Sequence, residues 1–282
     1  MDLGIVIFPT DTTLDPIRLA REVEDRGFES LWFPEHSHIP TSRATPWGGR
    51  ADAPPLPEKY WHTLDAFVSL GAVAAVTTTL RIGTAITLVA QRDPIWLAKE
   101  VATLDVISGG RFEFGVGFGW NREEMASHGV DASDRFGLVA EKLGVMRALW
   151  AEDEASFEGV RLTLEPSWAW PKPLQRPHPP IVVGTGAGPK GLDVVFGHAD
   201  GWMPHWRTLP TALAAFRAEA DRRGLDPAAW ELTVSGVGET LDDLALAAET
   251  GARRALFALD EAPPAEVLAT LDRLADLKER FG

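Results

Sequence analysis

The amino-acid sequence predicts an α/β protein, a single (β/α)8 TIM barrel built from residues 1–282. Short apolar runs of strand length alternate with longer segments whose apolar residues recur with helical periodicity. Eight of each can be counted along the chain, and eight such units close most simply into a barrel. A chain of 282 residues has a suitable length for one barrel domain, so we expect one domain rather than two.

The predicted strands are apolar over most of their length, as expected for parallel strands that are covered on both faces. They are expected at residues 3–8, 29–34, 81–89, 111–116, 180–183, 200–203, 231–235 and 253–258. Two segments interrupt the alternation and are interpreted as insertions. Residues 35–61, after the second strand, are rich in Pro and Gly, and residues 151–179, before the fifth strand, are rich in Trp and Pro.

Local signals mark the ends of the predicted helices. An aspartate followed by proline is typical of a helix start, because the carboxylate caps free backbone N–H groups and proline fits the first turn. The chain has this pair at Asp15-Pro16, Asp93-Pro94 and Asp226-Pro227. Glycine just past a periodic segment favours the left-handed residue that ends a helix. Such glycines are Gly27, Gly109, Gly110, Gly224 and Gly251.

Composition excludes several function classes. With 41 acidic and 27 basic residues the formal net charge is −14, so nucleic acid and anionic lipid surfaces are unfavourable partners. The chain has no cysteine, which rules out disulfides, thiolate metal sites and cysteine nucleophiles. It shows neither a signal peptide nor an apolar stretch long enough for a membrane span. We therefore expect a soluble cytoplasmic protein that binds a small molecule.

In a TIM barrel the loops that follow the strands gather at one end and carry the functional groups. Five of the eleven tryptophans lie in or beside such segments: Trp47, Trp61, Trp120, Trp202 and Trp206. Each one alone could equally fill a gap in the core. Together they favour a pocket for a flat ligand or an apolar substrate. We assign Trp61, Trp120 and Trp202, with His205, to this substrate pocket.

The segment after the second strand places Glu35 and His36 side by side at the expected mouth of the barrel. A histidine can take or deliver a proton near neutral pH, so His36 is the leading catalytic candidate. The alternative is a loop histidine with a purely structural hydrogen bond. A metal-dependent hydrolase is a further alternative, because Glu35, His36 and His38 could chelate a metal with ligands such as His62, His128 or His205. No helical pair of ligands with metal-binding spacing supports that interpretation.

Two glycine-rich turns follow the fourth and fifth strands, at residues 115–120 and 184–190. Glycines let backbone N–H groups approach phosphate oxygens, and a helix starting at Pro189 would add its positive N-terminal end. The second turn, Gly184-Thr185-Gly186-Ala187-Gly188, is therefore the better anion site. Neither turn matches the dinucleotide fingerprint or the Walker loop, so nucleoside triphosphates are disfavoured. Tight turns also use glycine for purely structural reasons.

The segment that leads into the fourth strand lies at the opposite rim, away from the expected site. We interpret residues 103–111 as a helix end closed by glycines, and we expect Arg111 to pair with a carboxylate there. A nucleophilic serine in a Gly-x-Ser-x-Gly elbow is absent.

Several of these segments together resemble the luciferase-like monooxygenase superfamily. The resemblance is carried by residues 93–98, 102–111, 115–120, Glu123-Glu124, 171–173, 177–181, 184–189 and 199–202. Within the superfamily the chain is most similar to short oxidoreductases that depend on the deazaflavin coenzyme F420. The acid and histidine after the second strand are Glu35-His36 here, whereas aspartate is the commoner acid in those proteins. Beyond about residue 205 the match weakens.

The resemblance implies a flavin or deazaflavin lying across the barrel mouth, with its phosphate on residues 184–188. It implies a non-proline cis peptide at Ala85-Ile86 that supports the ring, and a cofactor edge lined by Gly117, Phe118 and Gly119. His36 would carry the proton or contact the ring, and Glu35 would orient His36. Trp120 stands where one relative has an acting glutamate, so that glutamate's chemistry is not carried over.

The function expected from these features is hydride transfer between F420 and an uncharged organic substrate, with His36 handling the proton. In this view the barrel orients the cofactor, which carries the difficult chemistry. An FMN-dependent monooxygenase on the same fold is the first alternative, and the metal-dependent hydrolase is the second. A flavin-binding barrel without catalytic activity is a third, since a fold does not prove chemistry. A homodimer is expected from the resemblance and from the apolar early helices.

Overall fold

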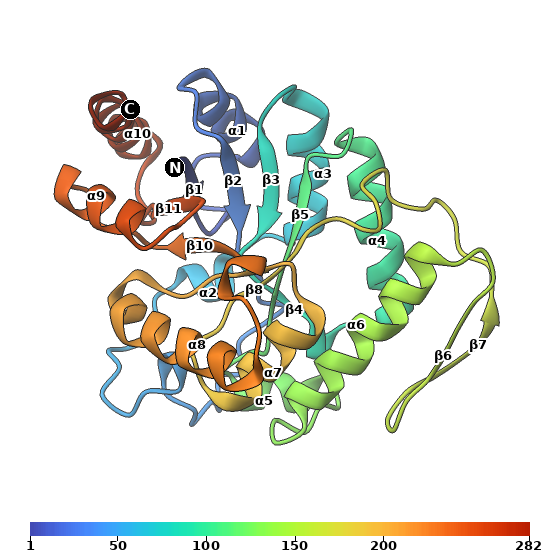
Figure 1. Cartoon of the computed structure of the whole chain (residues 1–282). Coiled ribbons are helices and arrows are strands. Elements are labelled where there is room, and N and C mark those ends of the chain that lie inside the picture. The colour runs from blue at the N-terminus through green and yellow to red at the C-terminus, as the bar shows by residue number, and fades with distance from the viewer.

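The structure is a computed structural model that describes all 282 residues. Its strands form one closed barrel surrounded by helices, with the order β3-β2-β1-β11-β10-β9-β8-β5-β4 and a further pairing of β3 with β5 that closes the ring (Figure 1). All neighbouring barrel strands are parallel. The predicted TIM barrel is therefore confirmed.

The barrel strands agree with the predicted segments, because parallel strands need apolar side chains toward both the barrel interior and the helices. Their bounds are β1 (Asp2–Val6), β2 (Ser30–Phe33), β3 (Arg81–Thr84), β4 (Thr87–Leu88), β5 (Phe112–Gly117), β8 (Ile181–Val183), β9 (Gly201–Trp202), β10 (Glu231–Ser235) and β11 (Arg254–Ala258). The single strand expected over 81–89 is divided into β3 and β4 at the cis peptide bond between Ala85 and Ile86. Both β3 and β4 pair with β5 and together count as one strand of the barrel, so the nine ranges make eight barrel strands.

Most helices cover the outside of the barrel and pack their apolar sides on the strands, whereas the short helices α2 and α5 lie beside the cavity at the mouth. They are α1 (Pro16–Asp25), α2 (Lys59–His62), α3 (Ala66–Val76), α4 (Pro94–Ile107), α5 (Arg122–Ser127), α6 (Arg135–Ala151), α7 (Pro189–His198), α8 (Leu209–Arg223), α9 (Leu241–Glu249) and α10 (Pro264–Phe281). None of them combines the length and the apolar character needed to span a membrane.

The predicted helix signals hold in most places. Asp15 and Asp93 cap α1 and α4 through backbone N–H groups of the first turn. All five glycines expected at helix ends adopt positive φ angles. Asp226-Pro227 also begins a helix, with the Asp226 carboxylate accepting from the Ala228 N–H, but this helix is a single 3₁₀ turn over Pro227–Ala229 because β10 begins only two residues later.

The two insertions differ in structure. Residues 35–61 run mostly as irregular chain across the barrel mouth, with a 3₁₀ turn at Trp47–Gly49 and the start of α2. Residues 151–179 include an antiparallel hairpin of β6 (Ala155–Glu158) and β7 (Thr163–Ser167), which projects beside α6 (Figure 1). The sequence analysis did not predict these two strands.

The rim opposite the mouth is closed by buried charges. Arg254, at the start of β11, is 1% exposed and donates two hydrogen bonds each to Glu29 and Glu113. Arg81 also pairs with Glu113. Arg111 behaves differently from the prediction: its guanidinium donates to main-chain carbonyls and to the Thr77 hydroxyl rather than to a carboxylate. These carbonyls lie at helix and strand ends, where they have no other partner, so the arginine joins the elements of this rim.

Candidate functional site

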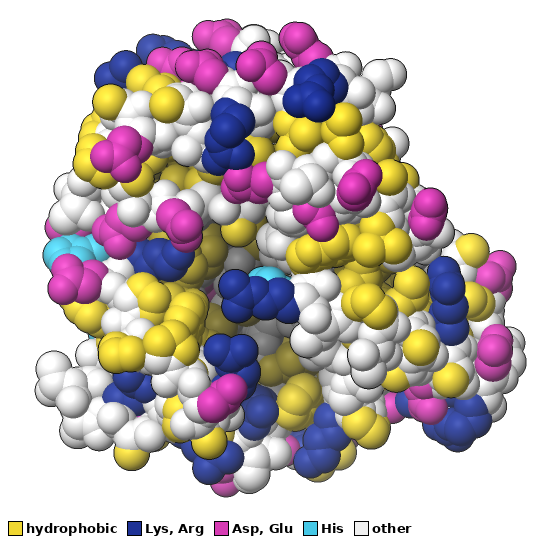
Figure 2. Space-filling model, turned by 90° about the vertical axis from the view of Figure 1, so that its left-hand side faces the viewer, with side chains coloured by type: hydrophobic (Ala, Val, Ile, Leu, Met, Phe, Trp, Pro, Cys, Tyr) yellow, Lys and Arg dark blue, Asp and Glu magenta, His cyan; other side chains and the backbone are white.

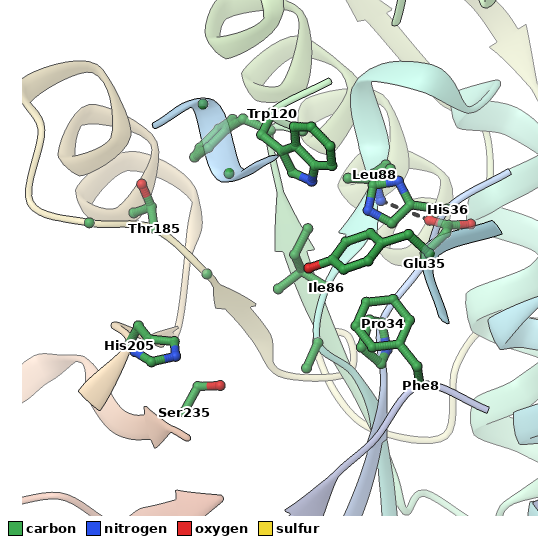
Figure 3. A pocket seen from close by; sticks show the side chains of 18 of the residues that line it. Phe8, Pro34, Glu35, His36, Ile86, Leu88, Trp120, Thr185, His205 and Ser235 are labelled. Carbon is green, nitrogen blue, oxygen red and sulfur yellow. Dashed lines mark hydrogen bonds between the residues drawn. The ribbon is translucent and has the colours of Figure 1, made fainter. Parts of the chain in front are cut away.

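A cavity of about 1160 Å³ opens at the ends of the strands, where the sequence places the functional loops. Every barrel strand contributes lining residues from its end or from the loop that follows it. Phe8, Pro34 and His36 lie on one side, Thr185, His205 and Ser235 lie on the other, and Ile86 lies between them (Figure 3). The space-filling view in Figure 2 shows a hollow on this part of the molecule. The cavity is large enough for a cofactor together with a small substrate.

The floor of the cavity is formed by Ala85 and Ile86. Their peptide bond is cis, as the resemblance to the family implied. Gly117 and Gly184 flank the Ile86 side chain so closely that a Cβ on either one would lie 2.2 or 2.5 Å from it. These two glycines therefore make room for Ile86, and Gly117 itself does not line the cavity. Phe118 and Gly119 do line it.

His36 is held by a buried carboxylate. Its Nδ1 lies 2.8 Å from Oε2 of Glu124, a residue of α5 that is fully buried. The other oxygen of Glu124 accepts a hydrogen bond of 3.1 Å from the backbone N–H of Ser37. An ionised carboxylate only accepts, so Nδ1 carries the proton in this arrangement. The remaining nitrogen, Nε2, makes no hydrogen bond within the protein, and His36 lines the cavity.

Glu35 does not contact His36 through a hydrogen bond, so the expectation that it orients the imidazole is wrong. Its carboxylate accepts from the backbone N–H of Leu88 at 2.7 Å and pairs with Arg92. The two side chains leave neighbouring positions of the chain in different directions, as Figure 3 shows. Glu35 therefore supports the segment that follows the cavity floor.

A buried lysine supports the same segment from behind. Lys142 of α6 donates to the carbonyl oxygens of Ala90 and Arg92, at 2.8 and 2.6 Å. Burial lowers the pKa of this lysine to about 8, partly offset by the charge of Asp93. Glu35 and Lys142 thus hold the segment from Leu88 to Arg92, which follows the cavity floor, by hydrogen bonds and an ion pair.

Insertion 35–61 supplies an aromatic wall. Tyr60, the only tyrosine of the chain, lies with its ring centroid 5.0 Å from that of His36 and 4.7 Å from that of Phe8. Its hydroxyl accepts a hydrogen bond of 2.8 Å from the indole N–H of Trp47. Burial raises the pKa of Tyr60 despite that hydrogen bond. Trp120 completes the wall, at 5.8 Å from His36 between ring centroids.

The turn after β8 presents its backbone to the cavity. Gly184, Thr185 and Gly186 line it, whereas Ala187 and Gly188 do not. A Cβ on Gly186 would have no atom within 4 Å, so the space above this residue is open to a ligand. The predicted helix α7 begins at Pro189. The indole N–H of Trp202 donates to the Thr185 carbonyl at 2.9 Å and fixes the turn.

Of the four residues assigned to the substrate pocket, Trp120 and His205 line the cavity and two do not. Trp202 is 1% exposed and stacks on Phe216 in the packing between barrel and helices, and Trp61 is 48% exposed on α2 outside the cavity. Burial, with the nearby charges of Arg207 and Arg50, lowers the pKa of His205. Its Nδ1 accepts from the backbone N–H of Arg207, so a neutral His205 carries its proton on Nε2.

The alternative metal site is not assembled. Glu35 is engaged by Leu88 and Arg92, and His36 by Glu124. His38 hydrogen-bonds through Nδ1 with the Ser37 hydroxyl. The structure holds no group of three His, Cys, Asp or Glu side chains arranged to bind a metal ion.

Sequence reasoning missed several lining residues. Tyr60, Arg122 and Arg135 line the cavity, and Glu124 holds His36 from behind. Glu124 was noted only as part of the resemblance. The available signal for Glu124 was Asn121, which caps the start of α5 and accepts a hydrogen bond from the Glu124 N–H in the first turn of that helix. Tyr60 lies in an irregular insertion, where periodicity gives no indication of direction.

A model of the luciferase-like monooxygenase family matches residues 9–279. The chain belongs to this family. An uncharacterized protein of Mycobacterium tuberculosis is 39% identical over 280 residues, which are 98% of each chain. An F420-dependent hydroxymycolic acid dehydrogenase of the same organism is 26% identical over 218 residues, 74% of this chain and 54% of that protein. This chain therefore spans about half of that dehydrogenase.

Several solved structures share the fold of this chain. Monooxygenase RslO1 from Streptomyces bottropensis has a TM-score of 0.79 at 21% identity, and each chain is covered completely. The coenzyme F420-dependent tetrahydromethanopterin reductase from Methanopyrus kandleri has a TM-score of 0.74 at 15% identity, covering 100% and 99%. Riboflavin lyase with a modified FMN has a TM-score of 0.66 at 18% identity, covering 89% of this chain and 66% of that one. The chain thus belongs to the luciferase-like monooxygenase family and has an F420-dependent sequence relative, while the F420-dependent reductase and the riboflavin lyase share its fold.

Proposed function

We propose that this protein is an oxidoreductase that transfers a hydride between coenzyme F420 and an uncharged organic substrate, with His36 handling the accompanying proton. The observation that carries the proposal is the His36–Glu124 pair, which lies at 2.8 Å beside an apolar cavity floor. Relatives described as F420-dependent support the choice of cofactor.

The residues of the cavity fit a deazaflavin or flavin. Ala85 and Ile86 offer an apolar surface for one face of a planar ring, and Phe118 and Gly119 would line the ring's edge. Gly184, Thr185 and Gly186 would hold the phosphate, because the open space at Gly186 lets a ligand reach bare backbone. When bound, the cofactor supplies or accepts the hydride.

The protein's own contribution is orientation and proton handling. Glu124 fixes the imidazole ring of His36 and keeps the proton on Nδ1, which leaves Nε2 as the basic nitrogen. An Nε2 without a partner in the protein can accept a proton from an alcohol-type substrate, or return one to a carbonyl oxygen in the reverse direction. The Glu124 carboxylate stabilises the imidazolium formed in between.

The remaining walls position the substrate and limit the access of water. Phe8, Tyr60 and Trp120 give an apolar side around His36. His205 and Ser235 lie across the cavity and offer polar groups to the other end of a ligand (Figure 3). A largely apolar pocket with a few polar groups suits an uncharged organic molecule.

An FMN-dependent monooxygenase is the second candidate function. Its support is the likeness in fold to monooxygenase RslO1 and to a riboflavin lyase that holds a modified FMN. The same floor and phosphate turn would hold FMN, since the two cofactors share a tricyclic ring and a phosphate-bearing chain.

Titration of the purified protein with F420 and with FMN distinguishes the two candidates. We expect F420 to bind more tightly and to raise the melting temperature more, because ligands of the native state stabilise it by mass action. Tighter binding of FMN, with oxygen consumption on reduction, would support the monooxygenase instead. Tight binding without consumption of reduced cofactor by any substrate in a panel of alcohols and carbonyl compounds would favour a barrel without catalytic activity.

We also propose that the protein is a homodimer through the exposed ends of α3 and α4. Val68, Ile95 and Trp96 are 76%, 51% and 70% exposed, and they belong to two helices that pack against each other. A cluster of large exposed apolar side chains is typical of a protein interface.

A further inference from the structure

Two arginines without acidic partners lie in the wall of the cavity. Arg122 and Arg135 are the first residues of α5 and α6, and both line the cavity. Neither forms an ion pair, whereas Arg161 and Arg223 each pair with two carboxylates. Cations on a protein with a net charge of −14 would ordinarily find an acidic neighbour.

Arg135 is held in place but is incompletely satisfied. One terminal nitrogen donates to the Ala132 carbonyl, and the guanidinium lies over the Phe136 ring at 4.6 Å from its centroid. Its Nε is buried and makes no hydrogen bond. A buried donor without a partner is costly, so the guanidinium of Arg135 is not fully satisfied by the protein.

The acidic residues nearby are engaged elsewhere. Glu123 lines the same wall, but its Oε1 accepts from the backbone N–H groups of Ala44 and Thr45, at 3.0 and 3.1 Å. Asp134 precedes Arg135 and pairs with Arg161. Glu123 is thus the carboxylate of this wall, but it forms no ion pair with either arginine, and its Oε2 is buried without a hydrogen-bond partner.

The electrostatics of this wall favour an anion. Burial, and to a smaller extent the charge of Arg122, lowers the pKa of Arg135. Both groups stay charged at physiological pH. Figure 2 shows Lys and Arg side chains gathered around the hollow on this face, in contrast to the acidic overall charge.

We propose that Arg122 and Arg135 form a subsite for a carboxylate or phosphate group of the bound ligand, at the side of the cavity formed by α5 and α6. Two guanidinium groups can bind such a group through several charge-assisted hydrogen bonds. The proposal rests on the assignment of this cavity as the ligand site and deepens the proposed function. Either the cofactor or the substrate could carry the anionic group.

Inorganic pyrophosphate tests the subsite without any cofactor. The double variant Arg122→Gln/Arg135→Gln is compared with wild type and with Arg21→Gln/Arg280→Gln, which removes the same charge from two exposed arginines outside the cavity that form no ion pair. We expect millimolar pyrophosphate to raise the melting temperature of wild type and of the control clearly more than that of the cavity variant, in which the turn at residues 184–186 is unchanged. Equal stabilisation of all three proteins, or of none, would overturn the proposal.

Cofactor binding identifies the source of the anion. F420 carries a phosphate and carboxylates, whereas its riboside core lacks both. If the cofactor supplies the group, the cavity variant loses about tenfold or more in affinity for F420 and little for the core. If affinity for F420 is unchanged while pyrophosphate no longer protects the variant, the group belongs to the substrate, and the expectation of an uncharged substrate is wrong.

Failure of the proposed function is distinguishable from failure of the subsite. If neither F420 nor FMN binds wild type but pyrophosphate still protects it through the two arginines, the subsite stands and the cofactor assignment falls.

Discussion

The carboxylate of Glu124 and the imidazole of His36 lie 2.8 Å apart, although they are separated by 88 positions in the sequence. His36 lies in the loop after β2, and Glu124 lies in the short helix α5 after β5. Closure of the barrel brings these two segments to the same end. Glu124 also accepts from the Ser37 N–H, so one buried carboxylate fixes both the histidine and the backbone beside it.

Replacing Glu124 by Gln is expected to lower turnover of the bound cofactor by about 10- to 100-fold, because an amide N–H can donate to Nδ1 and so leave the proton on Nε2, and because a neutral amide stabilises the imidazolium poorly. Cofactor affinity should change little. The pH profile of turnover should shift as well, which a merely structural defect would not cause. Glu123→Gln is the matched control, since Glu123 contacts Ala44 and Thr45 rather than His36. Equal losses of turnover and affinity in the Glu124 variant would assign the residue to binding instead.

Replacing Gly186 by Ala separates ligand binding from folding. No atom lies within 4 Å of an added Cβ, so the melting temperature without ligand should stay unchanged. Affinity for FMN and F420 should fall, because the methyl group would occupy the space at the phosphate turn. Unchanged affinity in Gly186→Ala would place the phosphate elsewhere.

In Gly117→Ala the added Cβ would meet Ile86 at 2.2 Å, so that variant should lose stability and regain part of it when Ile86→Ala is added.

Replacing Arg254 by Met should lower the free energy of unfolding by about 3–5 kcal/mol, because the buried Glu113 would lose two hydrogen bonds and keep only Arg81 as a cationic partner. Chemical denaturation measures the change. Arg253→Gln is the control: it breaks an ion pair with Glu231 in which both side chains are about half exposed, and it should cost less than about 1 kcal/mol. Comparable losses in both variants would show that burial of the network is unimportant.

Glu24 should contribute to acid stability. Burial alone would raise the pKa of its carboxyl, but the backbone N–H groups of Thr79, Leu80 and Thr78 outweigh this and lower the pKa from 4.5 to about 2. Because the folded-state pKa is lowered, this stabilisation is complete above pH 4.5 and is lost as the pH falls toward 2. Glu24→Gln should therefore unfold more easily at neutral pH and lose less stability on acidification than wild type. Glu249→Gln, at an exposed site on α9 without an ion pair, should retain the wild-type slope.

Introducing a charge at Trp96 should dissociate the proposed homodimer. The Trp96→Glu variant is expected to elute as a monomer, with its mass measured by light scattering, because a carboxylate would be buried without a partner. Val160→Glu alters a residue that is 92% exposed at the hairpin between β6 and β7, and it should keep the wild-type mass. A wild-type monomer, or a Trp96 variant that is still dimeric, would contradict the proposed interface.

The sequence by itself determined the barrel, the positions of its strands and the caps at Asp15 and Asp93, because strand length, apolar periodicity and capping are local properties of the chain. It also placed His36 and the 184–188 turn at the barrel mouth, and the resemblance to the luciferase-like superfamily added the cis peptide at Ala85-Ile86. Only the tertiary structure decided that Glu124 rather than Glu35 holds His36, that Trp61 and Trp202 lie outside the cavity, and that Arg122 and Arg135 face it without acids. Those relations depend on distances between loops of different strands, which are set by barrel closure and by the path of an irregular insertion rather than by any local pattern.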